Sequence, residues 1–196
     1  MTTPIVDPRD TSRWSHHVDE AFYARLREHV RVLAADWPAQ DHTTVAEASS
    51  VLTREARLID SGRLDDWLAM FSDDCLYWVP VTVGSGDPLR EVSHAFDDKR
   101  RLTDRVFWHN TGLAYSQIPP SRVRHLIGNV EAIAQDDLRF VRSNSVVTEF
   151  RPGGTKTYAG WCGHVLTRVE GDWKILLKQV NLIDSDQSHE NLTLVL

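Results

Sequence analysis

The chain has 196 residues, of which 41% are hydrophobic and 26% are charged, and its formal net charge is −6 at pH 7. These values are typical of a globular chain with one hydrophobic core, and they exclude a disordered or fibrous protein. The basic residues are scattered among acidic ones, which argues against a nucleic-acid partner because such a surface needs clustered positive charge.

The sequence carries no signal for export or membrane insertion. No stretch approaches the roughly 18 consecutive apolar residues of a membrane-spanning helix, and residues 1–20 contain no apolar core of signal-peptide type. The two cysteines, Cys75 and Cys162, are too few for a disulfide framework or a four-cysteine metal site. We therefore expect a cytoplasmic protein without a membrane partner.

Residues 1–43 are predicted to form an N-terminal arm and helix outside the main domain, which we assign to residues 44–196. Residues 1–15 show no periodicity and are interpreted as an arm whose order depends on a neighbour. From Val18 to Trp37, apolar residues recur every three or four positions, which predicts an amphipathic helix that Pro38 ends.

Two further helices are predicted before the first strand. Thr44 and Glu47 have the spacing of a capping box, in which each side chain satisfies a free backbone N–H group, so a helix should begin there. Gly62 should end this helix because glycine adopts a left-handed conformation without steric cost. The apolar residues between Leu64 and Phe71 then indicate a short third helix.

Strands dominate the rest of the chain. Residues 75–83 are aromatic and β-branched with a period of two, which predicts a strand. Asp97 is in a position to cap a fourth helix that carries Leu102, Val106 and Trp108. Four long strands are then predicted at 122–134, 138–150, 156–169 and 173–183, separated by the turn sequences "QDD", "RPGGT" and "EGD". This order predicts an α+β fold, with helices on one face of a curved antiparallel sheet.

The segment Cys162-Gly163-His164 has the C-x-H spacing that forms half of the ligand set of a Rieske iron–sulfur centre. No cysteine follows it, so we interpret the pair as a thiol and an imidazole that line one face of a strand. The histidines show no short metal-ligand spacing, so no metal is expected to be bound by this chain alone. Acidic neighbours raise the pKa of a thiol, which makes Cys75 a poor nucleophile.

An acid–base site is an alternative interpretation of "FSDDCLYWVP" at residues 71–80. Asp74 and Tyr77, with His109 or His125, would serve as base and acid of a dehydratase or isomerase in a pocket between helices and sheet. A small-ligand binding module would use the same pocket without acid–base groups. We favour a third interpretation, in which Asp73 and Asp74 form the polar turn between a helix and a strand.

The final segment "ENLTLVL" alternates Leu192, Leu194 and Leu196 with other residues, so it predicts an apolar terminal strand. Such a strand needs cover, which its own sheet or a partner subunit would supply equally well.

Three segments resemble one known family. They are "EARLIDSGRLDDWLAMFSDDCLYWVPV", "DDKRRLTDRVFWHNTGLAYSQIPPSRVRHLIGNV" and the terminal "NLTLVL", and the resemblance runs from about Glu47 to Leu196. The chain is similar here to the small (beta) subunit of aromatic-ring-hydroxylating Rieske dioxygenases. His109 departs from this pattern because an apolar residue is expected at its position.

The resemblance implies a cone-shaped fold like that of nuclear transport factor 2 (NTF2-like, also called cystatin-like), with helices on a strongly curved antiparallel sheet. It also implies a structural, non-catalytic role in an α3β3 hexamer that oxygenates aromatic compounds with electrons from NAD(P)H. The beta subunits would trimerise, and the partner alpha subunit would hold the Rieske [2Fe-2S] cluster, the mononuclear iron and the substrate pocket.

Interface residues follow from the segments that carry the resemblance. Those expected at subunit contacts are Arg100, Arg105, Tyr115, Pro119, Pro120, Arg122, Arg124, Asn191, Leu192, Leu194 and Leu196.

Overall fold

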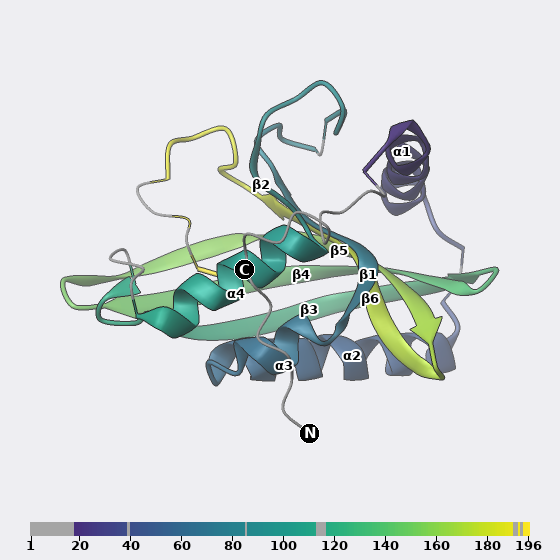
Figure 1. Cartoon of the computed structure of the whole chain (residues 1–196). Coiled ribbons are helices and arrows are strands. Elements are labelled where there is room, and N and C mark those ends of the chain that lie inside the picture. Colours follow the sequence, from purple (N-terminus) through teal and green to yellow (C-terminus); the bar gives the residue numbers. More distant parts are fainter. Residues whose placement is uncertain (1–17, 39, 85, 113–116, 190–191, 193) are drawn as a thin grey trace.

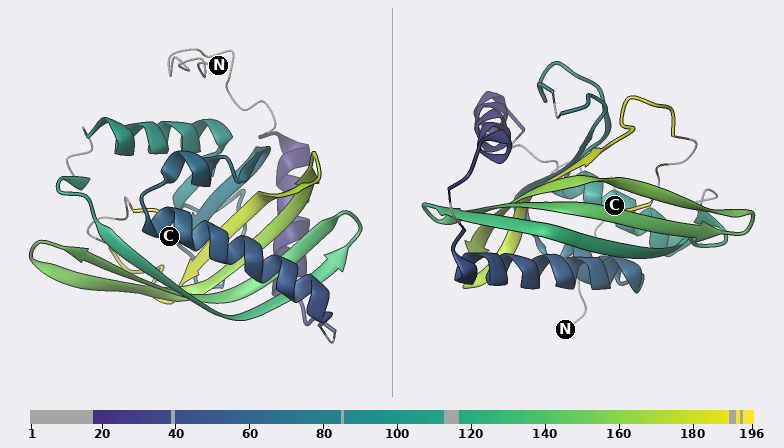
Figure 2. Two further views of the ribbon diagram at one scale, coloured as in Figure 1. Left: turned by 90° about the horizontal axis from the view of Figure 1, so that it is seen from below. Right: turned by 180° about the vertical axis from the view of Figure 1, so that it is seen from behind.

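The computed structural model describes residues 18–38, 40–84, 86–112, 117–189, 192 and 194–196. A strongly curved sheet forms the centre of the molecule (Figure 1, Figure 2). Its six strands are β1 (Phe71–Pro80), β2 (Ser93–Asp98), β3 (Arg122–Gln135), β4 (Leu138–Arg151), β5 (Gly154–Val169) and β6 (Asp172–Leu182). Their order is β2-β1-β6-β5-β4-β3, and all neighbours are antiparallel except β1 and β6, which are parallel.

Helices cover both faces of this sheet. The concave face packs against α2 (His42–Asp60), α3 (Leu64–Leu68) and α4 (Lys99–Thr111), whereas α1 (Glu20–Ala34) lies on the convex face (Figure 2). None of the helices in the described part of the chain is long and apolar enough to cross a membrane. The order of helices first and a meander of β3 to β6 afterwards confirms the predicted α+β class. The helix on the second face and the parallel pair of β1 and β6 differ from the predicted helices on one face of an antiparallel sheet.

The first helix is shorter than predicted. Asp19 caps α1 by accepting a hydrogen bond from the N–H group of Phe22 at 2.8 Å, and the helix ends at Ala34 without reaching Trp37. The indole N–H of Trp37 instead donates to the carbonyl of Val32 at 2.8 Å, and its ring stacks under the guanidinium of Arg142 at 3.9 Å. The apolar spacing in the sequence extends beyond the end of the helix because Trp37, although it lies in an extended segment, packs against the same hydrophobic cluster as α1.

The predicted capping box is wrong. Asp41 is the N-cap of α2, and its carboxylate accepts hydrogen bonds from both the N–H and the hydroxyl of Thr44. Thr44 therefore lies inside the first turn, and Glu47 points towards Arg168 on β5 at 3.8 Å. The end of the helix is as predicted, since Gly62 has φ +69° and its N–H donates to the carbonyl of Ile59.

The predicted polar turn at Asp73 and Asp74 is also wrong, because β1 already begins at Phe71. The carbonyl of Met70 accepts a hydrogen bond from the N–H group of Ile175 on β6 at 2.8 Å, which draws this segment into the sheet. Asp73 and Asp74 are the exposed residues of a strand that is otherwise buried.

Strand β2 was not predicted, because it has only six residues and most of them are polar. As a consequence, the cap of α4 is Asp98 and not Asp97, and Asp98 accepts a hydrogen bond from the N–H group of Arg101 at 2.9 Å. Asp97 instead binds the guanidinium of Arg105. Trp108, expected on the buried face of α4, is 52% exposed.

The edge strand β3 has polar groups placed along its outer side. The N–H group of Ala132 donates to the side-chain carbonyl of Gln40 at 2.6 Å, and the N–H group of His125 donates to Asp60 at 3.2 Å. These contacts fasten both ends of α2 to the edge of the sheet.

Candidate functional site

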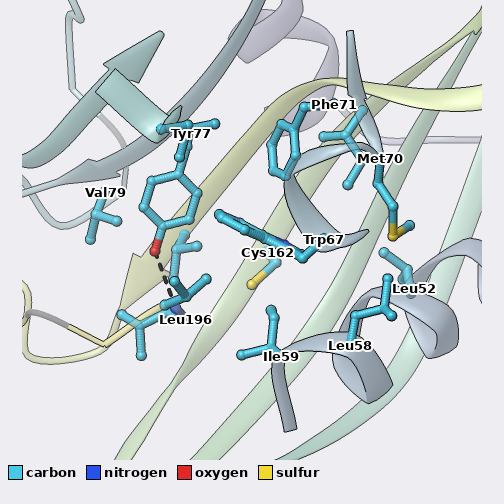
Figure 3. Packing of buried hydrophobic residues seen from close by; sticks show 14 of the residues in the cluster. Leu52, Leu58, Ile59, Trp67, Met70, Phe71, Tyr77, Val79, Cys162 and Leu196 are labelled. Atoms are coloured by element: carbon cyan, nitrogen blue, oxygen red, sulfur yellow. Dashed lines mark hydrogen bonds between the residues drawn. The ribbon is translucent and has the colours of Figure 1, made fainter. Parts of the chain in front are cut away.

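The candidate site is the buried polar centre of the cone, between α2 and the concave face of the sheet. It is surrounded by the large apolar cluster shown in Figure 3, in which Trp67, Tyr77 and Cys162 come from three different elements. Polar groups in such surroundings are costly unless they are paired, so their arrangement is informative.

Glu55 is at the middle of this centre. Its Oε1 accepts hydrogen bonds from Lys178 Nζ at 2.8 Å and Trp67 Nε1 at 3.1 Å, and its Oε2 contacts His164 Nε2 at 3.1 Å. The side chains of Glu55, His164 and Lys178 are at most 4% exposed. His164 and Lys178 are cross-strand partners on β5 and β6, so the sheet register places both opposite the same point of α2.

The contacts between Glu55 and its partners keep Glu55 and Lys178 charged. Burial by itself raises the pKa of Glu55, but the interactions with Lys178 and His164 outweigh it, so the pKa lies well below its ordinary value. Burial lowers the pKa of Lys178, and Glu55 more than compensates, so that pKa is raised. One carboxylate and one ammonium therefore coexist in the interior as a compensated pair.

A second carboxylate–imidazole pair lies beside the first. His125 on β3 contacts Asp60 at the end of α2, with Nδ1 to Oδ1 at 2.7 Å, and both side chains are less than 10% exposed. Burial lowers the pKa of His125, Lys178 lowers it further, and Asp60 only partly opposes this effect. His125 is therefore a neutral imidazole at neutral pH.

The chain's own last residues close this interior. Leu194, Val195 and Leu196 are 2–4% exposed, and the N–H group of Leu196 donates to the hydroxyl of Tyr77 at 3.2 Å (Figure 3). The remaining cavity beside Leu196 has a volume of about 10 Å³, which is close to the minimum for a single water molecule. These residues form no strand, so the predicted terminal strand is wrong, and their cover comes from their own chain.

The four predicted acid–base residues are not brought together. His125 lines the cavity beside Leu196, and Tyr77 contacts Leu196, while burial raises the pKa of Tyr77. Asp74 points to the opposite, convex face of the sheet, where it lines a small cavity under α1. His109 lies on α4, away from the residues that line the interior cavity. This geometry gives no support to a catalytic set made of these four groups.

The cysteines are buried thiols. Burial raises the pKa of Cys75 to about 12, with Asp74 and Asp98 adding to it, and burial raises that of Cys162 to about 11. Cys162 and His164 share the concave face as predicted, but His164 is already bound to Glu55. They therefore do not fit the ligand half of a Rieske cluster. Among the described residues, no group of three or more His, Cys, Asp or Glu is placed to hold a metal ion.

The predicted interface residues differ in how exposed they are. Pro119, Pro120, Arg122 and Arg124 are exposed, whereas Leu194 and Leu196 are buried in the chain's own core. Arg122 lies over the ring of Phe150 at 4.5 Å. Leu192 and Arg100 are half-buried, as is Arg105, whose partner is Asp97. Tyr115 and Asn191 lie outside the described residues. The interface role of this set stays a prediction.

The sequence did contain a signal for the residues that the prediction missed. Glu55 stands between Leu52 and Ile59, on the apolar stripe of the second helix, where a charge is unexpected. Lys178 likewise shares a strand face with Val180 and Leu182. Two opposite charges on two buried faces are the pattern of an internal ion pair.

Solved structures support the fold. The beta subunit of benzoate 1,2-dioxygenase from Burkholderia mallei is 27% identical, with a TM-score of 0.63 over 81% of this chain and 100% of that chain. A naphthalene 1,2-dioxygenase chain is 20% identical, with a TM-score of 0.71 over 98% of this chain and 100% of that one. An NTF2-like protein with a cystatin-like fold from Novosphingobium aromaticivorans is 16% identical, with a TM-score of 0.51 over 82% and 90% of the two chains. The predicted NTF2-like fold is confirmed.

The chain is also similar in sequence to subunits of known dioxygenases. The small oxygenase component of the p-cumate 2,3-dioxygenase system of Pseudomonas putida is 31% identical over 78% of this chain and 87% of its own length. The beta subunit of benzoate 1,2-dioxygenase of Acinetobacter baylyi is 30% identical over 72% of this chain and 88% of its own length. Residues 54–187 match the family described as "Ring hydroxylating beta subunit". The chain therefore belongs to the family of ring-hydroxylating beta subunits.

Proposed function

We propose that this chain is the small subunit of the terminal oxygenase of an aromatic-ring-hydroxylating dioxygenase, and that it supports a large subunit in an α3β3 hexamer. The observation that carries the proposal is the family match over residues 54–187 together with the relative that is a small oxygenase component. The large subunit would bind the Rieske [2Fe-2S] cluster and the mononuclear iron, which supply electron transfer and oxygen activation.

The role proposed for this chain is structural and not catalytic. The closed interior supports this role, because a cavity of about 10 Å³ has no room for an aromatic substrate while Leu194, Val195 and Leu196 stay in place. The pairing of Glu55 with Lys178 and His164 is a further support, since these groups are already engaged with one another.

Co-expression with a Rieske-type large subunit tests the assembly. The two chains should co-purify in equal amounts at the mass of a hexamer, and the complex should oxygenate an aromatic ring with NAD(P)H and separate electron-transfer partners. A large subunit that forms a fully active trimer without this chain would refute the supporting role.

The non-catalytic role has a separate test within the same complex. Tyr77→Phe and His125→Gln remove interior groups that an acid–base mechanism would need. Turnover per large subunit should stay unchanged once the hexamer has formed. A loss of turnover in an intact hexamer would show that these groups take part in the reaction.

The exposed Arg122 gives a test of the interface. Arg122→Ala should weaken co-purification with the large subunit more than it lowers the melting temperature, because a guanidinium buried at an interface leaves its partners unpaired, at a cost on the order of 2–5 kcal/mol. Arg63→Ala, which changes an exposed arginine paired with Asp66, is the matched control. Full stoichiometry with the Arg122 variant would contradict its interface role.

A further inference from the structure

Two of the buried imidazole nitrogens that lack a hydrogen-bond partner among the described residues lie beside the interior cavity. They are Nε2 of His125 and Nδ1 of His164, and the side chains that carry them are 4% and 3% exposed. Both residues line the cavity that Leu196 closes. Unsatisfied polar atoms in a protein interior are uncommon and call for an explanation.

Each carboxylate fixes one ring proton on the histidine that it contacts. An ionised carboxylate only accepts hydrogen bonds, so Asp60 requires a proton on Nδ1 of His125, and Glu55 requires one on Nε2 of His164. His125 is neutral. In a neutral imidazole the other nitrogen is an acceptor. The cavity therefore presents one hydrogen-bond acceptor, Nε2 of His125, beside the unpartnered Nδ1 of His164.

The residues that close the cavity make no hydrogen bond to these two nitrogens. Leu194, Val195 and Leu196 contribute apolar side chains, and the N–H group of Leu196 donates to the hydroxyl of Tyr77. The polar floor is also complete without them, since the partners of Glu55 come from α3, β5 and β6. Displacing the three residues would thus expose an apolar pocket with a formed polar floor.

We propose that the interior beneath Leu194–Leu196 is a binding site for a small apolar molecule with a hydroxyl group, such as a phenol, and that these three residues act as its plug. The hydroxyl would donate to Nε2 of His125, and the ring would take the place of the leucine side chain beside Tyr77. Trp67 and Tyr77 belong to the same apolar cluster as Leu196, and their aromatic faces suit a flat ring. The site belongs to this chain alone and does not depend on the proposed assembly.

The test shortens the plug and compares two ligands of similar size. Leu196→Ala should bind phenol, measured by calorimetric titration, at least about 10-fold more tightly than the unchanged chain does. Toluene has the methyl group in place of the hydroxyl and should bind this variant about 5-fold more weakly than phenol, the factor expected from one hydrogen bond. In the Leu196→Ala background, His125→Phe together with His164→Phe should remove this preference.

Leu126→Ala is the matched control, because Leu126 is 70% exposed on the convex face. It should bind phenol no better than the unchanged chain. The proposal is overturned if folded Leu196→Ala binds neither ligand, if it binds phenol and toluene equally, or if the control binds phenol as tightly. Should Leu196→Ala not fold, Leu194→Ala shortens the same plug and is held to the same three outcomes.

Discussion

Replacing Lys178 with methionine would separate the Glu55 carboxylate from its counter-charge while keeping most of the side-chain volume. Trp67 and His164 would still donate to Glu55, but no buried cation would remain beside it. Breaking a buried ion pair from one side costs about 3–5 kcal/mol, and the two remaining donors favour the lower end of that range. With a urea m-value of ~2 kcal/mol/M, a loss of about 3 kcal/mol lowers the unfolding midpoint by roughly 1.5 M.

The dependence on pH identifies the cause. In the unchanged chain the folded-state pKa of Glu55 is below its ordinary 4.5, so its stabilising contribution is complete above that value and is lost as the pH falls through the folded pKa. Without Lys178, burial dominates and raises the pKa of Glu55, which reverses the sign of the dependence of stability on pH. The free energy of unfolding of Lys178→Met should therefore rise as the pH falls from 7 towards 5, and the difference from the unchanged chain should shrink.

Urea unfolding followed by tryptophan fluorescence at both pH values measures this effect. Arg90→Met removes a cation that is 81% exposed and 3.8 Å from Asp87, and it should change the midpoint little because exposed ion pairs contribute little to stability. Glu55→Gln combined with Lys178→Met should recover part of the loss, since no unpaired charge remains. The reasoning fails if Lys178→Met loses equal stability at pH 5 and pH 7, or no more than the control.

Further predictions concern the caps, the thiols and the first helix. Asp41→Ala should lower the free energy of unfolding by about 1 kcal/mol, as loss of an N-cap does; a variant as stable as the unchanged chain in the same urea assay would contradict this role. Cys75 and Cys162 should resist iodoacetamide at pH 8 in the folded chain and react after unfolding, because both thiols are buried with raised pKa values. Mass spectrometry measures the labelling, and equal rates in the folded and unfolded states would contradict this prediction. Arg142 binds the carbonyl of Ala35 at 2.9 Å, so Arg142→Met should speed amide hydrogen exchange in α1 while leaving α2 protected, and unchanged exchange in α1 would count against this.

The sequence predicted the long strands well because each has strong local signals. The segments at 122–134 and 138–150 are confirmed almost to the residue, since the β-branched runs end at turn-forming sequences. The errors lie where tertiary contacts override local preference. Pairing of Phe71 with Ile175 on β6 starts the first strand before Asp73, and pairing with β1 makes a strand of the mostly polar segment Ser93–Asp98.

The site was harder to predict because its groups come from distant parts of the chain. Glu55 and Lys178 lie on a helix and a strand whose relative position depends on the whole sheet register, which no short motif encodes. Tyr77 and Asp74 are close in sequence but lie on opposite faces of one strand, so the acid–base alternative grouped two residues that the fold separates. The positions of two charges on apolar faces were visible in the sequence, but their pairing required the fold.

The contacts of Gln40 and Asp60 with the edge strand limit how this protein can associate. Exposed edge strands recruit further strands through their free amides, which leads to open-ended growth of a sheet. Side chains already occupy the amides of Ala132 and His125, towards opposite ends of β3. A strand arriving from another molecule would have to displace both, so side-chain surfaces and not backbone ladders are left as the means of recognition along this edge.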